Sequence, residues 1–399
     1  MLKPFAQLPP VAAALHLGTR VVSVTREGFD KVKSAGRERT PFVIRALRGG
    51  EVIELSARAV IDSTGTWNQP NPLGANGLPA IGEPEAADRI AYGIPDVLGA
   101  ARGRYAGKRT LVVGAGHSAA HALLDLAELA RQVPGTALAW AVRSPALTRV
   151  FGGGEADALP ARGALGSALR ALRDSGALAF HAGMRITHIE RDGQQLTLHG
   201  VDLQGQAQRI DGIDEIVCAT GQRPDLTMTR ELRVRLDPWL ESTEALGPLI
   251  DPNLHSCGTV RPHGHRELAH PEPGLYTVGV KSYGRAPTFL MATGFEQVRS
   301  VVAAIAGDLE AADRVELDLP ETGVCSIGGS ATEGIADAAC CGAPSTAAAT
   351  GCCGGPAKAD ASACCALDEQ KKAEGQSGCG CGTAPQPAAL RPRSATACC

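Results

Sequence analysis

The stretch from Thr110 to Ala130 constrains the fold of this chain more than any other. An apolar run, Leu111–Val113, is typical of a buried parallel strand, and it ends at Gly114-Ala115-Gly116. The sequence therefore predicts a strand, a glycine turn and a helix in direct succession, as at the start of a dinucleotide-binding α/β unit. The helix is predicted from apolar residues at helical spacing, namely Ala120, Leu123, Leu124, Ala127 and Ala130.

The two glycines of this turn have distinct physical roles. Gly114 allows the tight turn after the strand, and Gly116 lets the backbone approach a pyrophosphate. The helix then starts at His117 and Ser118, where free N–H groups and the helix dipole favour an anion. Ala120 stands where a third glycine often stands, and alanine is accepted there. We expect Gly114, Gly116, His117 and Ser118 to bind the phosphates of a dinucleotide.

The next strand indicates which dinucleotide binds. Residues Ala137–Val142 form a second apolar run, followed by Arg143-Ser144. An acidic residue at this place would hold the ribose 2′-hydroxyl of NAD, whereas an arginine suits a 2′-phosphate. The alternative is a surface arginine that merely ends the strand. We expect NADPH as the cofactor, with Arg143 at its 2′-phosphate.

Length and charge exclude several functional classes. The 399 residues are enough for two globular domains with additional segments. A net charge of -3 without a basic stripe gives no reason to expect nucleic acid. No apolar run is long enough to span a bilayer, and the N-terminus has no basic region followed by an apolar core. We expect a cytoplasmic protein that binds neither nucleic acid nor membrane.

Two predicted strands end in Thr-Gly and divide the chain into similar parts. The first runs from Ala59 into Thr64-Gly65, and the second runs from Glu215 into Thr220-Gly221. Short antiparallel strands are predicted before each of them, and residues 70–107, rich in Pro and Gly, are predicted to be a connection. The predicted meander strands are Val21–Val24, Phe42–Leu47 and Val52–Leu55 in the first part, and a group within 185–211 in the second.

Four segments together carry a family resemblance. They are Ile61–Pro70, Leu111–Leu124, Ile216–Asp225 and Gly274–Val302. Over roughly residues 20–306 the chain resembles the flavin-containing monooxygenases and the thioredoxin reductase-like oxidoreductases. The resemblance implies an α/β fold with two Rossmann-like dinucleotide-binding domains, in which an NADPH domain is inserted into an FAD domain.

The resemblance also implies domain boundaries and further cofactor contacts. Residues 108–224 would be the NADPH domain, 1–107 and 225–310 the two parts of the FAD domain, and 311–399 a tail. FAD and NADPH are the implied cofactors. A helix expected at 288–306 would direct its N-terminus at the pyrimidine edge of the flavin, where its dipole stabilises a reduced, anionic flavin. The residues implied at the domain crossings and at the closing FAD strand are Thr64, Gly65, Thr220, Gly221 and Gly279.

Four features depart from the family pattern. The first Gly-x-Gly-x-x-Gly, which holds the FAD pyrophosphate, is absent, so the FAD side is expected to be incomplete. The monooxygenase fingerprint has a histidine four residues after a glycine, but here the residue four positions after Gly82 is Ala86. The closing strand of the family often continues as Gly-Asp, whereas Gly279 is followed here by Val280-Lys281. A Cys-x-x-Cys for a dithiol relay is also lacking before the tail.

Isolated cysteines and histidines have two interpretations each. Cys218 lies in a predicted buried strand and is expected to be a small core residue, although a reactive thiol is the alternative. Cys257 lies in a loop and has the same alternative. The pair His263-x-His265 is expected to be a solvated part of a Pro-rich loop, with metal binding as the alternative.

The tail differs in composition from the rest of the chain. From about residue 320 it is rich in Ala, Gly, Ser, Thr and Pro, which predicts disorder because little apolar surface can be buried. Neighbouring thiolates select soft ions such as Cu(I) and Zn, and trivalent arsenic extends that set. The alternative is a low-complexity extension whose cysteines have no role. The candidate ligands, whose first three pairs recur every twelve residues, are Cys340, Cys341, Cys352, Cys353, Cys364, Cys365, Cys379, Cys381, Cys398 and Cys399.

Two functional hypotheses follow from these features. The first is an NADPH-dependent FAD oxidoreductase, similar to flavin monooxygenases, that passes electrons to a small-molecule substrate or another acceptor and is linked by its tail to metal or arsenic handling. The flavin would supply the redox chemistry, so no acid–base residue is assigned. The second is a non-catalytic nucleotide-binding protein that sequesters a thiophilic metal or metalloid through its cysteine pairs.

Overall fold

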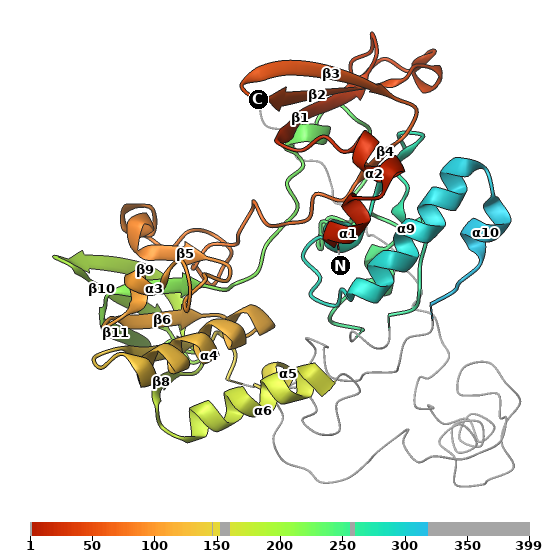
Figure 1. The fold of residues 1–399 in the computed structure, drawn as a ribbon. Helices are drawn as coiled ribbons and strands as arrows, with labels where there is room; N and C mark the ends of the chain where they lie inside the picture. The colour runs from red at the N-terminus through yellow and green to blue at the C-terminus, as the bar shows by residue number, and fades with distance from the viewer. Residues whose placement is uncertain (1, 146, 152–159, 256–259, 318–399) are drawn as a thin grey trace, which may run out of the picture. The chain divides into compact units, whose positions relative to one another are not determined.

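The computed structural model describes residues 2–145, 147–151, 160–255 and 260–317 (Figure 1). The ten candidate cysteine ligands of the tail, Cys257 and the predicted disorder after residue 320 lie outside these residues. No helix in the described ranges is long and apolar enough to cross a membrane. The fold class expected from the sequence is confirmed, since parallel α/β sheet structure and separate antiparallel sheets are both present.

A parallel sheet of five described strands lies at the centre of the expected NADPH domain. Its strand order is β5-β12-β6-β7-β8, and each neighbouring pair is parallel. Helices α4 and α6 lie beside this sheet (Figure 1). The bounds are β5 Ile90–Tyr92, β6 Arg109–Val113, α4 His117–Gln132, β7 Ala137–Ala141, α5 Thr148–Phe151, α6 Pro160–Asp174, β8 Leu178–His181 and β12 Glu215–Cys218.

Burial explains why these segments form a central parallel sheet. Leu111, Val112 and Trp140 are completely buried, as expected for strands covered on both faces. The face of α4 that packs on the sheet carries small residues and leucines, so the helix axis approaches the strands closely. These helix residues are Ala119, Ala120, Ala122, Leu123, Leu126 and Leu129.

The prediction that residues 70–107 are only a connection is wrong. This segment contains η2 (Pro84–Arg89), β5 and α3 (Arg102–Tyr105), and β5 pairs with β12 as the outer strand of the parallel sheet. The strand has only three residues, Ile90–Tyr92, which is too short for a periodicity signal. The sheet thus begins before residue 108, and the predicted domain boundaries at 107, 224 and 310 stay a prediction.

Two antiparallel meanders were expected, and both are present. The first joins β1, β2 and β3, and the second joins β9, β10 and β11, each with its middle strand between the other two. Their inward side chains alternate with exposed ones, as in half-buried strands. The bounds are β1 Thr19–Arg26, β2 Phe42–Arg48, β3 Glu51–Ala57, β9 Arg185–Asp192, β10 Gln195–Val201 and β11 Ala207–Ile213.

The expected FAD side contains a two-stranded parallel sheet in the described residues. Strand β4 (Val60–Asp62) pairs with β13 (Leu275–Thr277), and β13 runs into the short helix η5 (Gly279–Tyr283). The helix predicted at 288–306 is α9 (Met291–Ala306), followed by α10 (Leu309–Asp313). The remaining short elements are α1 Leu2–Ala6, α2 Pro9–Ala14, η1 Arg37–Arg39, η4 Thr227–Thr229, α7 Gly247–Ile250 and α8 His265–Leu268.

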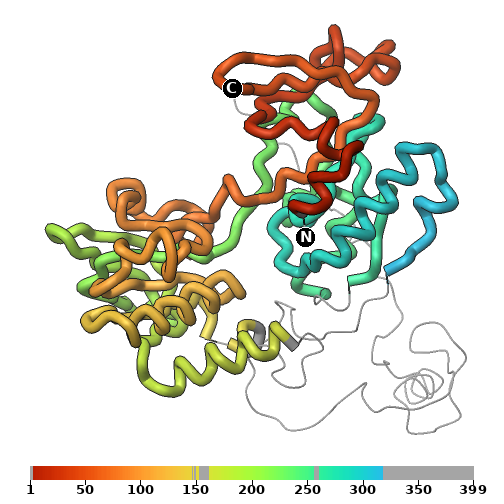
Figure 2. The backbone as a smooth tube through the Cα atoms, in the orientation of Figure 1, coloured from red at the N-terminus to blue at the C-terminus, as the bar shows by residue number. Residues whose placement is uncertain are grey.

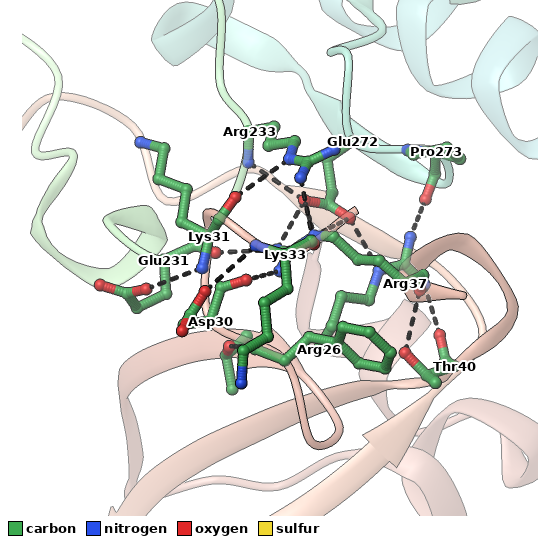
Figure 3. A network of polar contacts seen from close by, with 12 residues as sticks. Arg26, Asp30, Lys31, Lys33, Arg37, Thr40, Glu231, Arg233, Glu272 and Pro273 are labelled. Atoms are coloured by element: carbon green, nitrogen blue, oxygen red, sulfur yellow. Dashed lines mark hydrogen bonds and ion pairs between the residues drawn. The ribbon is translucent and has the colours of Figure 1, made fainter. Parts of the chain in front are cut away.

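A buried charge network connects the first meander to the segment before β13 (Figure 3). Arg26 Nε lies 2.9 Å from Glu272 Oε1, and Arg37 Nη2 lies 2.8 Å from Glu272 Oε2. The backbone N–H of Arg233 also donates to Glu272, at 3.1 Å. All three charged side chains are almost completely buried. Because every acceptor and donor is matched, the network fixes the meander in place at a tolerable desolvation cost.

Candidate dinucleotide-binding site

The turn between β6 and α4 has the geometry that requires glycine. Gly114 has φ of 136°, and a Cβ built on it would lie 2.2 Å from the carbonyl oxygen of Ala219, the residue after β12. Its N–H donates to Ala141 O at 3.1 Å, and its carbonyl accepts from Trp140 Nε1 at 2.8 Å. Gly114 is therefore held between β7 and the end of β12, so that the chain can turn sharply into the helix.

The N-terminus of α4 is open toward the residues that the structure describes. Gly116 is the N-cap residue, no described side chain caps the helix, and a Cβ on Gly116 would have no heavy atom of these residues within 4 Å. A helix leaves its first N–H groups without intrahelical acceptors, and the macrodipole adds partial positive charge there. His117 and Ser118 form the first turn, as expected. The residues present therefore fit a phosphate group placed against this turn.

Arg143 lies at the same edge of the sheet as this turn. Val113 and Ala141 are directly paired, so the end of β7 stands beside the end of β6, and Arg143 follows two residues later. Its side chain is exposed, and Nη1 donates to Ala75 O at 3.1 Å. Among the described residues its one acceptor is this neutral carbonyl, so the guanidinium keeps donors for a phosphate.

The second Thr-Gly segment lies beside residues 69–71, which follow the first one. Asn71 N–H donates to Gly221 O at 2.9 Å, and Thr220 Oγ1 donates to Asn71 O at 2.8 Å. Arg223 N–H bonds Gln69 O at 2.9 Å, so the two passages run side by side (Figure 2). Gly221 has φ of 96°, a backbone conformation that favours glycine at this position. The structure thus brings Thr220 and Gly221 to the segment that follows Thr64-Gly65.

The carboxyl ends of β4 and β13 are joined by a buried ion pair that the sequence analysis missed. Lys281 Nζ lies 2.6 Å from Asp62 Oδ2 and 3.0 Å from Thr64 Oγ1, and both charged side chains are 2% exposed. Thr64 in turn donates through N–H and Oγ1 to Asp62 Oδ1, at 3.1 and 2.7 Å. Thr64 therefore stabilises the pair, while Gly65, with φ of 71°, turns the chain away.

A second polar chain fixes Gly279 and the first turns of α9. Gly279 N–H donates to Gln297 Oε1 at 2.7 Å, and Gln297 Nε2 donates to Ser282 Oγ at 2.9 Å. Gln297 Nε2 also lies 2.8 Å from His263 Nε2. Gly279 itself has φ of 70° with open space around its Cβ position. This arrangement holds the turn after β13 through an α9 side chain.

The histidine interpretation needs correction. His263 is buried, and burial lowers its pKa, so it is a neutral core residue that contacts Gln297 and not a solvated one. His265 instead lies 2.9 Å from Asp313 Oδ1, so the two side chains have different partners. His270 is also buried and contacts Thr277 Oγ1 at 2.8 Å. Within the described residues no group of three or more His, Cys, Asp or Glu side chains is arranged to hold a metal ion.

Cys218 is a buried residue, as the sequence analysis expected. Burial raises the pKa of its thiol to about 11, and its Sγ lies 3.2 Å from Thr220 Oγ1. A thiol that stays protonated is a poor nucleophile, since the thiolate is the reactive form. Cys218 therefore supports the crossing segment through packing, and a reactive role in this environment is disfavoured.

The buried partners missed by sequence analysis are far apart in the chain. Asp62 and Lys281 are separated by 219 residues, and Gly279 and Gln297 lie on different elements. The available signal was chemical: a charged residue at the end of an apolar strand, such as Asp62, needs a partner if buried. Lys281, two residues after Gly279, supplies the matching charge.

No protein-family model matches the chain, and no curated protein sequence matches it. Among solved structures, it is similar to the FAD-bound cadaverine monooxygenase of the desferrioxamine pathway from Erwinia amylovora. The identity is 15%, the match covers 79% of this chain and 73% of that one, and the TM-score is 0.50. Bacillithiol disulfide reductase from Bacillus cereus matches at 16% identity over 78% of this chain and 74% of that one, with a TM-score of 0.49. At this identity the likeness to the FAD-bound monooxygenase shows the fold alone, and that fold is the one that the sequence resemblance implied.

Proposed function

We propose that this chain is an NADPH-dependent flavin oxidoreductase. The observation that carries the proposal is the open N-terminus of α4 behind Gly114 and Gly116, with Arg143 at the same sheet edge. A pyrophosphate fits the N–H groups of the turn, and the 2′-phosphate fits the exposed guanidinium. The fold likeness to FAD- and NAD(P)-dependent oxidoreductases supports the same assignment at the level of fold.

The FAD side offers contacts for the flavin end of a bound FAD. Gly65 and Gly279 have positive φ and little around their Cβ positions, so flat ring atoms could approach the backbone there. Gln297 and the Asp62–Lys281 pair hold these two turns together. When bound, FAD supplies hydride acceptance and electron transfer. The chain's own residues orient the two nucleotides and keep the buried charges paired.

The NADPH assignment is tested by Arg143→Ala. We expect the variant to bind NADPH at least about tenfold more weakly, because a charge-assisted phosphate contact is lost, and NADH with unchanged affinity. Binding is measured by titrating the nucleotide fluorescence. Arg131→Ala, which removes an exposed guanidinium at the other end of α4, is the matched control. Equal losses for NADPH and NADH, or no loss for either, would overturn the assignment.

The flavin assignment is tested by the visible spectrum of the purified full chain, before and after NADPH is added under nitrogen. A flavin band that bleaches supports the reductase half-reaction. A colourless protein that still binds NADPH after incubation with FAD overturns the flavin assignment and leaves a nucleotide-binding protein without redox turnover. Oxygen is then admitted to the reduced protein. Rapid return of the flavin band indicates that oxygen is the electron acceptor, and a band that stays bleached indicates another acceptor.

The cysteine pairs favour a second function, the binding of a thiophilic ion. Three pairs at twelve-residue intervals, beginning at Cys340, Cys352 and Cys364, bring two thiols together at each step. We propose that the tail binds a soft metal or trivalent arsenic, either beside the oxidoreductase activity or in its place. The reduced full chain is dialysed against Zn²⁺ or arsenite, and the amount of zinc or arsenic bound per chain is then measured. A variant with the ten candidate cysteines of the tail replaced by serine should lose the bound ion, and an equal content of the ion in both chains would contradict the proposal.

A further inference from the structure

The buried side-chain amide of Gln297 on α9 contacts three polar groups. Its Oε1 accepts the N–H of Gly279 at 2.7 Å, and its Nε2 lies 2.9 Å from Ser282 Oγ and 2.8 Å from His263 Nε2. Gln297 and Ser282 are completely buried, and His263 is 5% exposed. A buried group that loses a hydrogen bond finds no water to replace it, so the orientation of this amide matters to all three partners.

One arrangement of hydrogens satisfies all of these groups. The backbone N–H of Gly279 can only donate, so the Gln297 oxygen faces it and the Gln297 NH2 group faces the other two partners. The Ser282 hydroxyl donates to Gly279 O at 2.8 Å, so its oxygen accepts from Gln297. His263 Nδ1 lies 3.0 Å from Arg261 O, which can only accept, so Nδ1 carries the hydrogen and Nε2 accepts. The network therefore requires a neutral His263 in one tautomer.

The surroundings of His263 oppose its protonation near neutral pH. Burial lowers the pKa of the imidazole, and a hydrogen bond to a backbone carbonyl and the Glu267 carboxylate of α8 raise it by less. From η5 the imidazole meets the uncharged ring of Tyr283, with ring centroids 5.5 Å apart, and from α9 it meets the uncharged Gln297. The Asp313 carboxylate of α10 pairs with other side chains. His263 therefore takes up a proton only below the ordinary value of 6.5.

A proton on His263 Nε2 is incompatible with the Gln297 contacts. The new N–H would face the NH2 group of Gln297, so two donors would oppose each other. Turning the amide over would give the imidazolium an acceptor, but the NH2 group would then face the N–H of Gly279. The network can thus satisfy a protonated His263 or the Gly279 turn, and not both. We propose that Gln297, oriented by the neutral His263, positions the Gly279 turn, and that a proton on His263 releases this turn.

The consequence for a cofactor rests on the proposed function. Gly279 has φ of 70°, and none of the described residues lies within 4 Å of its Cβ position, so it is one of the two turns assigned to the flavin end of FAD. A turn released from Gln297 loses its fixed position, and a binding site that is not preorganised binds its ligand more weakly. FAD should therefore dissociate more readily once His263 is protonated.

NMR of the full chain as a function of pH tests the switch without any cofactor. The ring ¹⁵N shifts of His263 give its tautomer and its pKa, and hydrogen exchange, corrected for the intrinsic rate at each pH, gives the protection of the Gly279 amide. We expect the Nδ1–H tautomer at neutral pH and a pKa below 6.5. Protection should fall at least about tenfold as His263 takes up its proton, since one buried hydrogen bond is lost. An Nε2–H tautomer, or protection that does not follow the His263 titration, would overturn the proposal.

Two variants separate the switch from a purely structural role. His263→Gln keeps an acceptor for Gln297 but takes up no proton, so Gly279 should stay protected over the whole pH range. Gln297→Glu supplies a carboxylate that accepts from Gly279 and pairs with an imidazolium, so the pKa of His263 should rise above 6.5. His181→Gln, which removes a half-buried histidine of β8 whose pKa burial also lowers, is the matched control and should respond like the wild type.

Circular dichroism checks that each variant is folded at each pH. A His263→Gln chain whose Gly279 protection still falls in acid, or a Gln297→Glu chain in which the pKa of His263 stays below 6.5, would overturn the proposal. FAD titrations then test the consequence for the cofactor. The Kd for FAD should rise at least about tenfold with protonation in the wild type and stay constant in His263→Gln. The same pH curve for both chains would overturn the link to the cofactor. A chain that binds no FAD at any pH would contradict the proposed flavin function, while the NMR measurements still decide whether the switch operates.

Discussion

At the scale of single residues, burial makes each member of the Asp62–Lys281 ion pair depend on its partner. Replacing either partner alone leaves a buried charge without its counter-ion, because both side chains are 2% exposed. We expect Lys281→Met or Asp62→Asn to lower the free energy of unfolding by about 3–5 kcal/mol, as measured by urea denaturation. The double variant should cost less than the sum of the two single ones, since it leaves no unpaired charge.

The surface pair Arg45–Glu54 provides the control for this prediction. It has the same separation, 2.6 Å, but both side chains are more than half exposed. Water and salt screen such a pair, so Arg45→Met should change stability by only about 0–1 kcal/mol. Similar losses for Arg45→Met and Lys281→Met would contradict the view that burial decides the contribution of the ion pair.

At the scale of elements, the β6–α4 turn separates a glycine needed for folding from one needed for binding. Gly114→Ala introduces a Cβ at 2.2 Å from a backbone oxygen and a φ of 136°, so the turn must distort. We expect Gly114→Ala to lower the melting temperature strongly. Gly116→Ala meets no atom within 4 Å and has φ of −105°, so the fold should stay intact while NADPH binding weakens. Calorimetry and nucleotide titration of both variants test the contrast, and equal melting temperatures would count against it.

The same elements show what the sequence could and could not predict. The strand–turn–helix at 110–130 was predictable for two reasons. The spacing of its apolar residues changes from that of a strand to that of a helix at the glycine pair, and α4 is long enough for the helical spacing to repeat. β5 was missed because three residues, Ile90–Tyr92, are too few to show an alternation of apolar and polar side chains. The start of α9 was placed at 288 but lies at Met291, where the extended residue Leu290 ends the preceding turn. Which apolar residues of α9 are packed depends on distant partners, and no local pattern contains them.

At the scale of the whole molecule, Glu272 couples stability to pH. Burial alone would raise the pKa of this carboxyl, but hydrogen bonds from Arg37 and Arg26 and from the Arg233 N–H bring it below its ordinary value of 4.5. The folded state then binds fewer protons than the unfolded state near pH 4. The stabilisation is complete above the unfolded pKa of about 4.5 and is lost as the pH falls through the lower, folded value.

Two acid-sensitive windows follow from this network and from the buried histidines. Burial lowers the pKa of His263 and His270 from 6.5, so their part of the stability falls as the pH drops below about 6.5, where the unfolded state takes up protons first. Chemical denaturation of the wild type between pH 7 and 3 should therefore show a first decline below about 6.5 and a steeper one below about 4.5. Glu272→Gln should be less stable at neutral pH, keep the first decline and show a shallower second one, because other carboxyls with lowered pKa values, such as Glu296 and Asp313, remain. A Glu272→Gln curve parallel to the wild type down to pH 3 would mean that the arginines hold the meander without this carboxylate.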